Sequence, residues 1–237
     1  MVVGPDEELP RVTIGLLRRA DAMCPRLLHH EHFSGRKLSK LCDAGFAVTN
    51  RVVEDAITWH EGGRAGDSAR DAFPEPTDLE PEQRAYYDAL ARGYLALFPR
   101  TDATVADLDW STDLPELGVR LVGRIGIALE AGDDRELRVL RGGRRLTFDR
   151  ADTAFTVLRA AQWAPGPLRI VAFDPLTLDI DPTEVNVADH YDDMYAWVAE
   201  RVATIRARAD RLVAVAGSEC RHCSCIPGCP KLMASAS

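Results

Sequence analysis

Hydrophobic residues recur at helical spacing along four stretches of the chain, and this spacing predicts a helix in each. The four stretches are residues 43–60, 81–98, 150–163 and 187–212. In the last and longest stretch, the buried stripe is expected to contain Tyr191, Met194, Val198, Val202 and Ile205. The apolar residues from Leu9 to Arg19 form no regular stripe, so we expect a loop and then a helix there.

The middle of the chain changes to a period of two, which is typical of strands. Residues 118–129 alternate in this way and predict one strand. A turn at 131–134 and an apolar run at 137–140 complete a predicted hairpin. Residues 168–173 predict another strand, with 176–180 as its hairpin partner. This order of helices and strands indicates an α/β fold with a central mixed sheet flanked by helices.

The length of 237 residues fits one globular domain with short appendages. We expect a flexible N-terminus over residues 1–10, a single domain over 11–230 and a disordered tail over 231–237. Within the domain we expect three parts, which are a helical part (11–103), a sheet core (104–182) and a C-terminal helix with a cysteine tail (183–230).

The apolar runs are too short for a membrane span, which needs about 18 residues. The first residues carry acids and lack the apolar core of a signal peptide, so we expect a cytoplasmic protein. The net charge of −8 excludes a basic surface wrapped around DNA, and any contact with nucleic acid is expected to be local.

Cysteine gives the sharpest chemical signal. Four of the six cysteines lie within ten residues near the C-terminus, namely Cys220, Cys223, Cys225 and Cys229. In a reducing compartment such crowding indicates metal ligation rather than disulfides. Zinc could be bound by Cys220, Cys223 and Cys229 with either His222 or Cys225 as the fourth ligand. An iron–sulfur cluster would need one more ligand from elsewhere in the chain, and a redox-active or unligated tail is the third reading.

Two cysteine elements resemble those of the iron–sulfur branch of the RecB-like PD-(D/E)XK nuclease superfamily, which includes the AddB nuclease domain and CRISPR-associated exonucleases. The elements are Met23-Cys24-Pro25-Arg26 and the motif Cys220-x2-Cys223-x5-Cys229-Pro230. The resemblance covers residues 11–230 and implies a restriction-endonuclease-like core. It also implies that a 4Fe–4S cluster, bound by Cys24, Cys220, Cys223 and Cys229, joins the N- and C-terminal parts.

The catalytic positions of that family are vacated in this chain. Family members use carboxylates to hold Mg²⁺ or Mn²⁺, with a lysine assisting. The position of the metal-binding aspartate is matched by Gly126, and that of the early histidine by Asn50. Leu140 and Gly142 stand where the family has its second carboxylate and its lysine. We therefore expect no catalytic residues and an inactive nuclease fold.

Relocated carboxylates are the alternative that would restore activity. The candidates near the predicted hairpin and helix are Glu54, Glu116, Glu130, Asp133, Asp134 and Glu136. An acidic turn is usually a solvated turn, and activity would require two of these groups to converge on Mg²⁺ or Mn²⁺.

Arg141, Arg144 and Arg145 are candidate contacts to nucleic-acid phosphates, with a solvated hairpin end as the other reading. The arginines between 201 and 211 are interpreted as a solvated helix face. The first hypothesis is a non-catalytic iron–sulfur protein that binds single-stranded or duplex DNA, or a helicase or other partner protein, in repair or defence. The second is an active DNA exonuclease, and the third is a redox-sensing interaction protein.

Overall fold

The computed structural model describes residues 9–25, 28–29, 43–61, 73–74, 76–98, 103–106, 111–123, 126–141 and 146–211. Its helices and strands, in chain order, are β1 (Arg11–Val12), α1 (Ile14–Arg19), α3 (Asp43–Glu61), α5 (Pro81–Leu97), β2 (Thr104–Val105), β3 (Ser111–Leu114), a 3-10 turn (Pro115–Leu117), β4 (Val119–Val122), β5 (Ile127–Ala131), β6 (Asp134–Leu140), α6 (Arg150–Ala160), β7 (Pro167–Asp174), β8 (Asp179–Asn186) and α7 (Val187–Ala209). The four predicted helices are therefore present, within three residues of the predicted ends.

The strands form two mixed sheets. The larger has the order β2-β5-β6-β7-β8, and the smaller has the order β1-β4-β3. In the larger sheet β6 and β7 are parallel and α6 connects them, while the other neighbouring pairs are antiparallel. A parallel pair joined through a helix is the basic unit of α/β folds. The protein thus has an α/β fold with mixed sheets flanked by helices, although the predicted single sheet is divided in two.

The predicted strand over 118–129 is wrong, because it is two strands in different sheets. β4 belongs to the smaller sheet and β5 to the larger. Gly123 and Gly126, between them, have φ angles of 132° and 150°, which L side chains rarely adopt. The alternation of apolar residues continues across these glycines in the sequence, but the backbone turns there and changes sheet.

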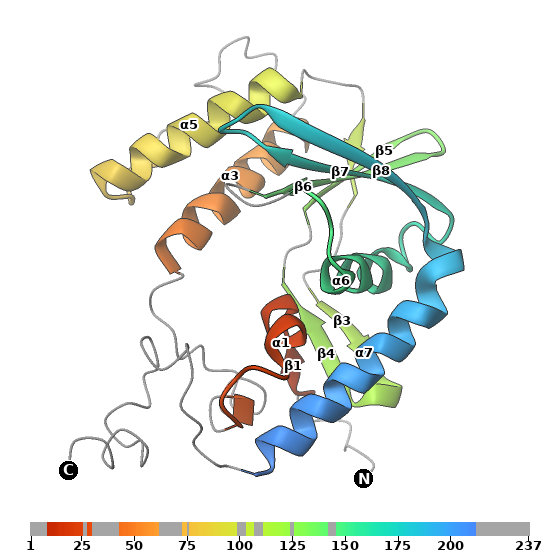
Figure 1. Ribbon diagram of the computed structural model, residues 1–237. Coiled ribbons are helices and arrows are strands. Elements are labelled where there is room, and N and C mark those ends of the chain that lie inside the picture. Colours follow the sequence, from red (N-terminus) through yellow and green to blue (C-terminus); the bar gives the residue numbers. More distant parts are fainter. Residues whose placement is uncertain are drawn as a thin grey trace, which may run out of the picture.

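Two hydrophobic layers cover the larger sheet, one on each face (Figure 1). α3 and α5 cover one face, where Tyr94 packs with Val171 and Phe173. α6 covers the other face and α7 packs against α6, and the buried residues of these helices join those of the smaller sheet in one cluster. Of the positions matched to the family motif, Leu140 ends β6 in the larger sheet, Gly126 directly precedes β5, and Asn50 lies on α3.

The C-terminal half of α7 reaches the N-terminal segment of the chain (Figure 1). Ile205 and Ala209 are buried there with Leu16, Ala20 and Met23. The β1 strand, which the sequence did not predict, pairs in parallel with β4 directly before α1. These contacts join regions that lie about 185 residues apart in the sequence, as the Arg208–Met23 hydrogen bond shows.

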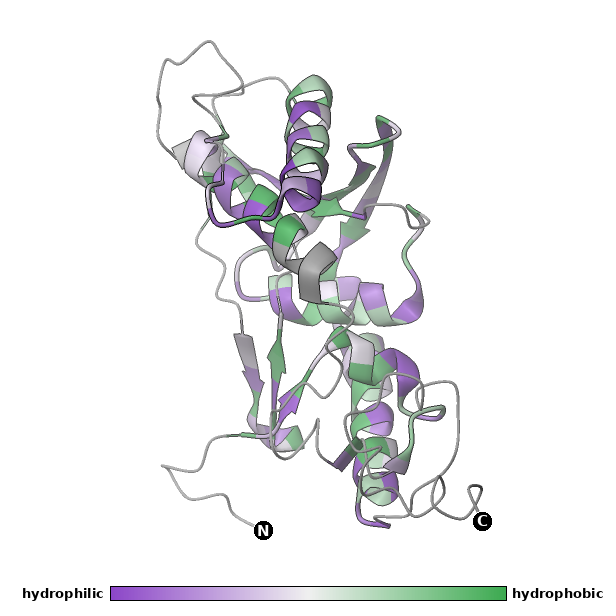
Figure 2. Cartoon of the chain, turned by 90° about the vertical axis from the view of Figure 1, so that its left-hand side faces the viewer, coloured by the Kyte–Doolittle hydropathy of each residue, from purple (hydrophilic) through white to green (hydrophobic). Residues whose placement is uncertain are grey.

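Hydrophobic and hydrophilic residues are interspersed along the helices, as expected for helices with one buried face (Figure 2). No helix in the described part of the chain combines the length and hydropathy needed to cross a membrane.

The β7–β8 hairpin differs from the prediction in where its second strand begins and ends. Residues 176–178 belong to the turn, and β8 continues to Asn186. Most of the predicted flexible N-terminus and the whole predicted disordered tail lie outside the described residues.

Candidate functional site

Gly126 lies directly before β5 in a position that excludes a side chain. A Cβ added there would lie 2.1 Å from the backbone oxygen of Arg138 and 2.9 Å from its carbonyl carbon. The φ angle of 150° adds backbone strain for any L residue. The glycine at this position is therefore required by the backbone, and the metal-binding aspartate implied by the resemblance does not fit here.

The structure describes two of the other matched positions. Leu140 ends β6 and packs against the hydrophobic cluster under α3 and α5. Asn50 lies half-buried on α3. Gly142 lies outside the described residues. Across the described part of the chain, no group of three or more His, Cys, Asp or Glu side chains could hold a metal ion.

An arginine-centred polar cluster occupies the face of β6 that carries Leu140, since residues two apart on a strand share a face. The buried Arg138 donates from Nε to Glu136 at 2.7 Å. Its Nη1 donates to the Tyr94 hydroxyl at 3.2 Å and to His60 Nε2 at 3.3 Å. The guanidinium also lies 4.2 Å from the centre of a phenylalanine ring at the end of α5. A single buried cation thus links β6 to α3 and α5.

Tyr94 is held protonated within this cluster. Burial raises the pKa of its hydroxyl to about 12, against the opposing effect of the nearby Arg138 charge. A hydrogen bond of 2.8 Å joins the hydroxyl to His60 Nε2. A phenol with this pKa does not act as a base at neutral pH. The cluster is therefore suited to holding helices on the sheet rather than to acid–base catalysis.

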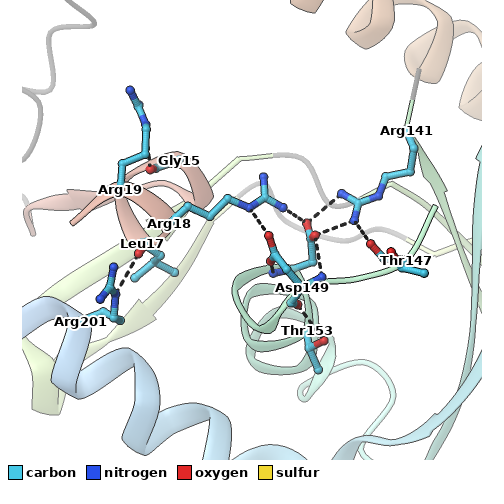
Figure 3. Close-up of polar contacts among 10 residues, drawn as sticks. Gly15, Leu17, Arg18, Arg19, Arg141, Thr147, Asp149, Thr153 and Arg201 are labelled. Atoms are coloured by element: carbon cyan, nitrogen blue, oxygen red, sulfur yellow. Dashed lines mark hydrogen bonds and ion pairs between the residues drawn. The ribbon is translucent and has the colours of Figure 1, made fainter. Parts of the chain in front are cut away.

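Arg141 binds a carboxylate of its own chain. It forms a bidentate pair with Asp152 on α6, from Nη1 to Oδ1 at 2.9 Å and from Nη2 to Oδ2 at 2.5 Å. Arg18 on α1 also binds Asp152, and its Nε donates to Asp149 at 2.8 Å. Figure 3 shows Arg18 and Arg141 approaching the start of α6 from opposite sides. The role of Arg141 as a contact to nucleic-acid phosphate stays a prediction. A phosphate group would have to compete with Asp152 for the Arg141 guanidinium.

The start of α6 explains why two carboxylates gather there. Asp149 is the N-cap and accepts from the Asp152 N–H at 2.8 Å, while Asp152 accepts from the Asp149 N–H at 3.2 Å. This reciprocal arrangement is a capping box, and its Asp-x-x-Asp pattern is a visible sequence signal. Burial by itself raises the pKa of Asp152, but hydrogen bonds and charges from Arg141 and Arg18 outweigh it, so the pKa lies below its ordinary value.

Several of the carboxylates considered for relocation are paired with side chains of the same chain. Glu130 accepts from the Trp163 indole at 2.5 Å, and Glu136 pairs with Arg138. Glu116 accepts from the Tyr195 hydroxyl at 3.5 Å. Asp133 lies in the β5–β6 turn. Each of these interactions is with an aromatic donor or an arginine, and the relocated site stays a prediction.

Cys24 lies where the two ends of the described chain meet. It is half-buried and packs against the cluster formed by the residues after α1 and the last turns of α7. Arg208 donates to the backbone oxygen of Met23, next to Cys24, at 2.7 Å. The other predicted ligands, Cys220, Cys223 and Cys229, lie outside the described residues, as do Arg144 and Arg145.

The interpretation of the α7 arginines as a solvated face is wrong for three of them. Arg201 donates to the Leu17 carbonyl at 2.9 Å, and Arg206 donates to the Gly118 carbonyl at 2.9 Å. Arg208 bonds to Met23, as described above. These guanidinium groups satisfy backbone oxygens of the N-terminal segment and the 3-10 turn. Their role in the fold is to fasten α7 to regions remote in the sequence.

Comparison with protein-family models gave no match, and comparison with curated proteins gave none either.

Proposed function

We propose that this chain is a catalytically inactive protein of the RecB-like nuclease fold that carries a 4Fe–4S cluster and acts by binding, in DNA repair or defence. The position of Cys24 is the observation that carries the proposal. Its contacts with the end of α7 place the N-terminal ligand candidate beside the helix that leads to the other three. A ligand set divided between the chain ends requires such a meeting point.

The remaining ligands are within reach of this point. Cys220 follows Arg211, the last described residue, by nine positions in the sequence. An extended segment of that length spans about 30 Å at most, so the chain can fold back to Cys24. Thiolates are the ligands that iron–sulfur clusters take in proteins. When bound, the cluster would supply a cross-link between the chain ends, and a one-electron redox centre.

Loss of catalysis is supported by the matched positions. Gly126 has no room for a carboxylate, and Leu140 packs in an apolar cluster. A divalent metal needs several oxygen ligands, and these two positions offer none. The exonuclease alternative, with Mg²⁺ or Mn²⁺, would depend on groups other than these.

The first experiment measures iron and acid-labile sulfide, with a visible spectrum, on anaerobically purified protein. We expect about four iron and four sulfide per chain, as a [4Fe–4S] cluster bound by four thiolates requires, and the broad visible band at ~400 nm that the resemblance implies. Cys24→Ser should lose the iron, and Cys225→Ser is the matched control that should keep it. A colourless protein with one zinc per chain would show that the cysteines bind zinc instead of a cluster. Most of the inference from the family resemblance would then be withdrawn.

A second experiment separates binding from cleavage. Cluster-loaded protein is incubated with single-stranded and duplex DNA in Mn²⁺ and in Mg²⁺. We expect no cleavage with either metal. Cleavage that is lost in Glu130→Gln or Asp134→Asn would establish the exonuclease instead.

A redox-sensing interaction protein is the other candidate, and the net charge favours it. The chain carries −8, and Arg18, Arg138 and Arg141 each bind a carboxylate of the same chain. Binding to DNA that weakens steeply with salt would argue against this candidate.

A further inference from the structure

Three large hydrophobic side chains are exposed together at the β7–β8 hairpin. Leu176, Leu178 and Ile180 are 46%, 52% and 50% exposed, and they are the exposed large hydrophobics of the described part of the chain. They alternate within five consecutive residues and form what we call the hairpin patch. Single exposed hydrophobics are ordinary, whereas a concentrated group marks an interaction surface.

Leu178 is unfavourable for the isolated chain in two ways. Its side chain is exposed, and its φ angle of 61° is left-handed, a region where Gly, Asn or Asp is usual. A leucine there strains the backbone without burying its side chain in this fold. Because strained residues gather where function retains them, the side chain is best explained by a contact outside the chain.

The hairpin patch is presented on a supported turn. The Asp174 carboxylate accepts from the Leu176 N–H at 2.9 Å and closes the turn. Pro175 packs on Gly93 of α5 so closely that an added Cβ on the glycine would lie 1.8 Å from the Pro175 oxygen. Figure 1 shows the hairpin end beside α5. A preformed surface of this kind loses little conformational entropy on binding.

The charge around the patch selects the kind of partner. Asp179, at the start of β8, is exposed and Asp181 is half-buried, whereas Glu184 lies opposite Arg169 of β7. Asp174 is buried under the turn, so Asp179 and Asp181 supply the charge beside the patch. A second copy would bring these like charges together, which disfavours self-association through this face. Pro182, in the middle of the edge strand β8, interrupts the N–H groups that an added strand would need. The partner therefore contacts side chains and supplies positive charge.

We propose that the hairpin patch docks an apolar surface of a partner protein that is rimmed by lysine and arginine. Leu176, Leu178 and Ile180 enter the apolar part of that surface, and Asp179 and Asp181 face its basic rim. This inference is independent of the cluster and of nucleic-acid binding, so its test does not involve either.

The test uses two synthetic amphipathic helical peptides of about 16 residues, long enough to form a helix in contact with a surface. Both have the same leucine face, and one has a lysine rim where the other has a glutamate rim. A scrambled lysine peptide controls for charge alone. Binding is followed by methyl NMR of the full-length protein. We expect shifts confined to Leu176, Leu178 and Ile180, with the lysine-rimmed peptide only.

Leu178→Asn separates a binding role from a structural one. Asparagine tolerates the left-handed conformation, so the thermal midpoint should equal or exceed that of the parent. Peptide affinity should fall about tenfold or more, as the loss of one buried leucine implies. Thr177→Ala, in the same exposed turn, is the matched control and should leave affinity unchanged. The double variant Asp179→Lys with Asp181→Lys should transfer preference to the glutamate-rimmed peptide.

Four results would overturn the proposal. NMR shifts spread over the whole protein, or equal affinity for the lysine-rimmed and glutamate-rimmed peptides, would contradict docking of a basic partner at the hairpin patch. A lower thermal midpoint for Leu178→Asn would assign the side chain to the fold instead. Dimerisation in sedimentation equilibrium that Leu178→Asn abolishes would make the occupant a second copy.

Discussion

The substitution Asp152→Asn tests how much the buried pair between Asp152 and Arg141 contributes to the free energy of unfolding. The Asp152 side chain is 5% exposed and accepts two hydrogen bonds from Arg141, whose side chain is 9% exposed. Asparagine retains one acceptor oxygen but removes the charge. Leaving a buried partner charge uncompensated costs about 3–5 kcal/mol. Arg18 is more exposed and keeps Asp149, so it adds less than about 1 kcal/mol.

The expected total of about 4 kcal/mol is a large share of the roughly 5–15 kcal/mol that stabilises an ordinary domain. The assay is urea denaturation in anaerobic buffer, with unfolding monitored by tryptophan fluorescence. Asp113→Asn is the matched control, because its pair with Arg120 is exposed and should contribute about 1 kcal/mol or less.

A double-mutant cycle identifies the source of the loss. Arg141→Met and Asp152→Asn are measured singly and together, and their coupling should exceed about 1 kcal/mol. If Asp152→Asn costs no more than Asp113→Asn, or if the two losses simply add, the buried pair does not stabilise the junction of α6 with β6 and the reasoning fails.

Three further outcomes follow from the described contacts. Because the pKa of Asp152 is lowered in the fold, its ionised form stabilises the protein above the ordinary carboxylate pKa of about 3.9, and this stabilisation is lost as the pH falls below that value. The difference in unfolding free energy between the parent and Asp152→Asn should therefore narrow from pH 5 to pH 3 in urea titrations. A constant difference would contradict this. Gly126→Asp should lower the urea midpoint strongly and restore no cleavage, since its Cβ would meet a backbone oxygen at 2.1 Å. Tyr87→Phe should cost about 1.5–3 kcal/mol because it removes a buried 2.5 Å hydrogen bond to Asp55, whereas Tyr195→Phe, at the surface, should change unfolding little.

The helices were predictable because their signal is local. The predicted helix over 43–60 became α3, and that over 81–98 became α5, whose first residue is the helix-starting Pro81. Strand assignments failed where the backbone, rather than the pattern, decides. Gly123 and Gly126 divide one alternating run between two sheets, and only their φ angles reveal it.

The polar clusters were not predictable for a different reason. Arg138 lies among apolar residues of β6, and its partner His60 is 78 residues away in the sequence. A strand pattern alone assigns such an arginine to solvent, because nothing local names its partners. By contrast, the absence of metal ligands at Gly126 and Leu140 was readable directly from the residue types. The steric reason for Gly126 required the position of the neighbouring strand.

The meeting of the chain ends has a protein component that exists apart from any cluster. Ile205 and Ala209 share a buried cluster with the N-terminal segment, and Arg201 and Arg208 bind its carbonyl oxygens. A cluster bound to Cys24 would thus add to an existing contact. The cross-link would still restrict the unfolded chain over nearly 200 residues, and its loss in Cys24→Ser should lower the stability of the whole domain. Because the α7 contacts remain in that variant, local pairing near Met23 should persist in hydrogen exchange even when the iron is gone.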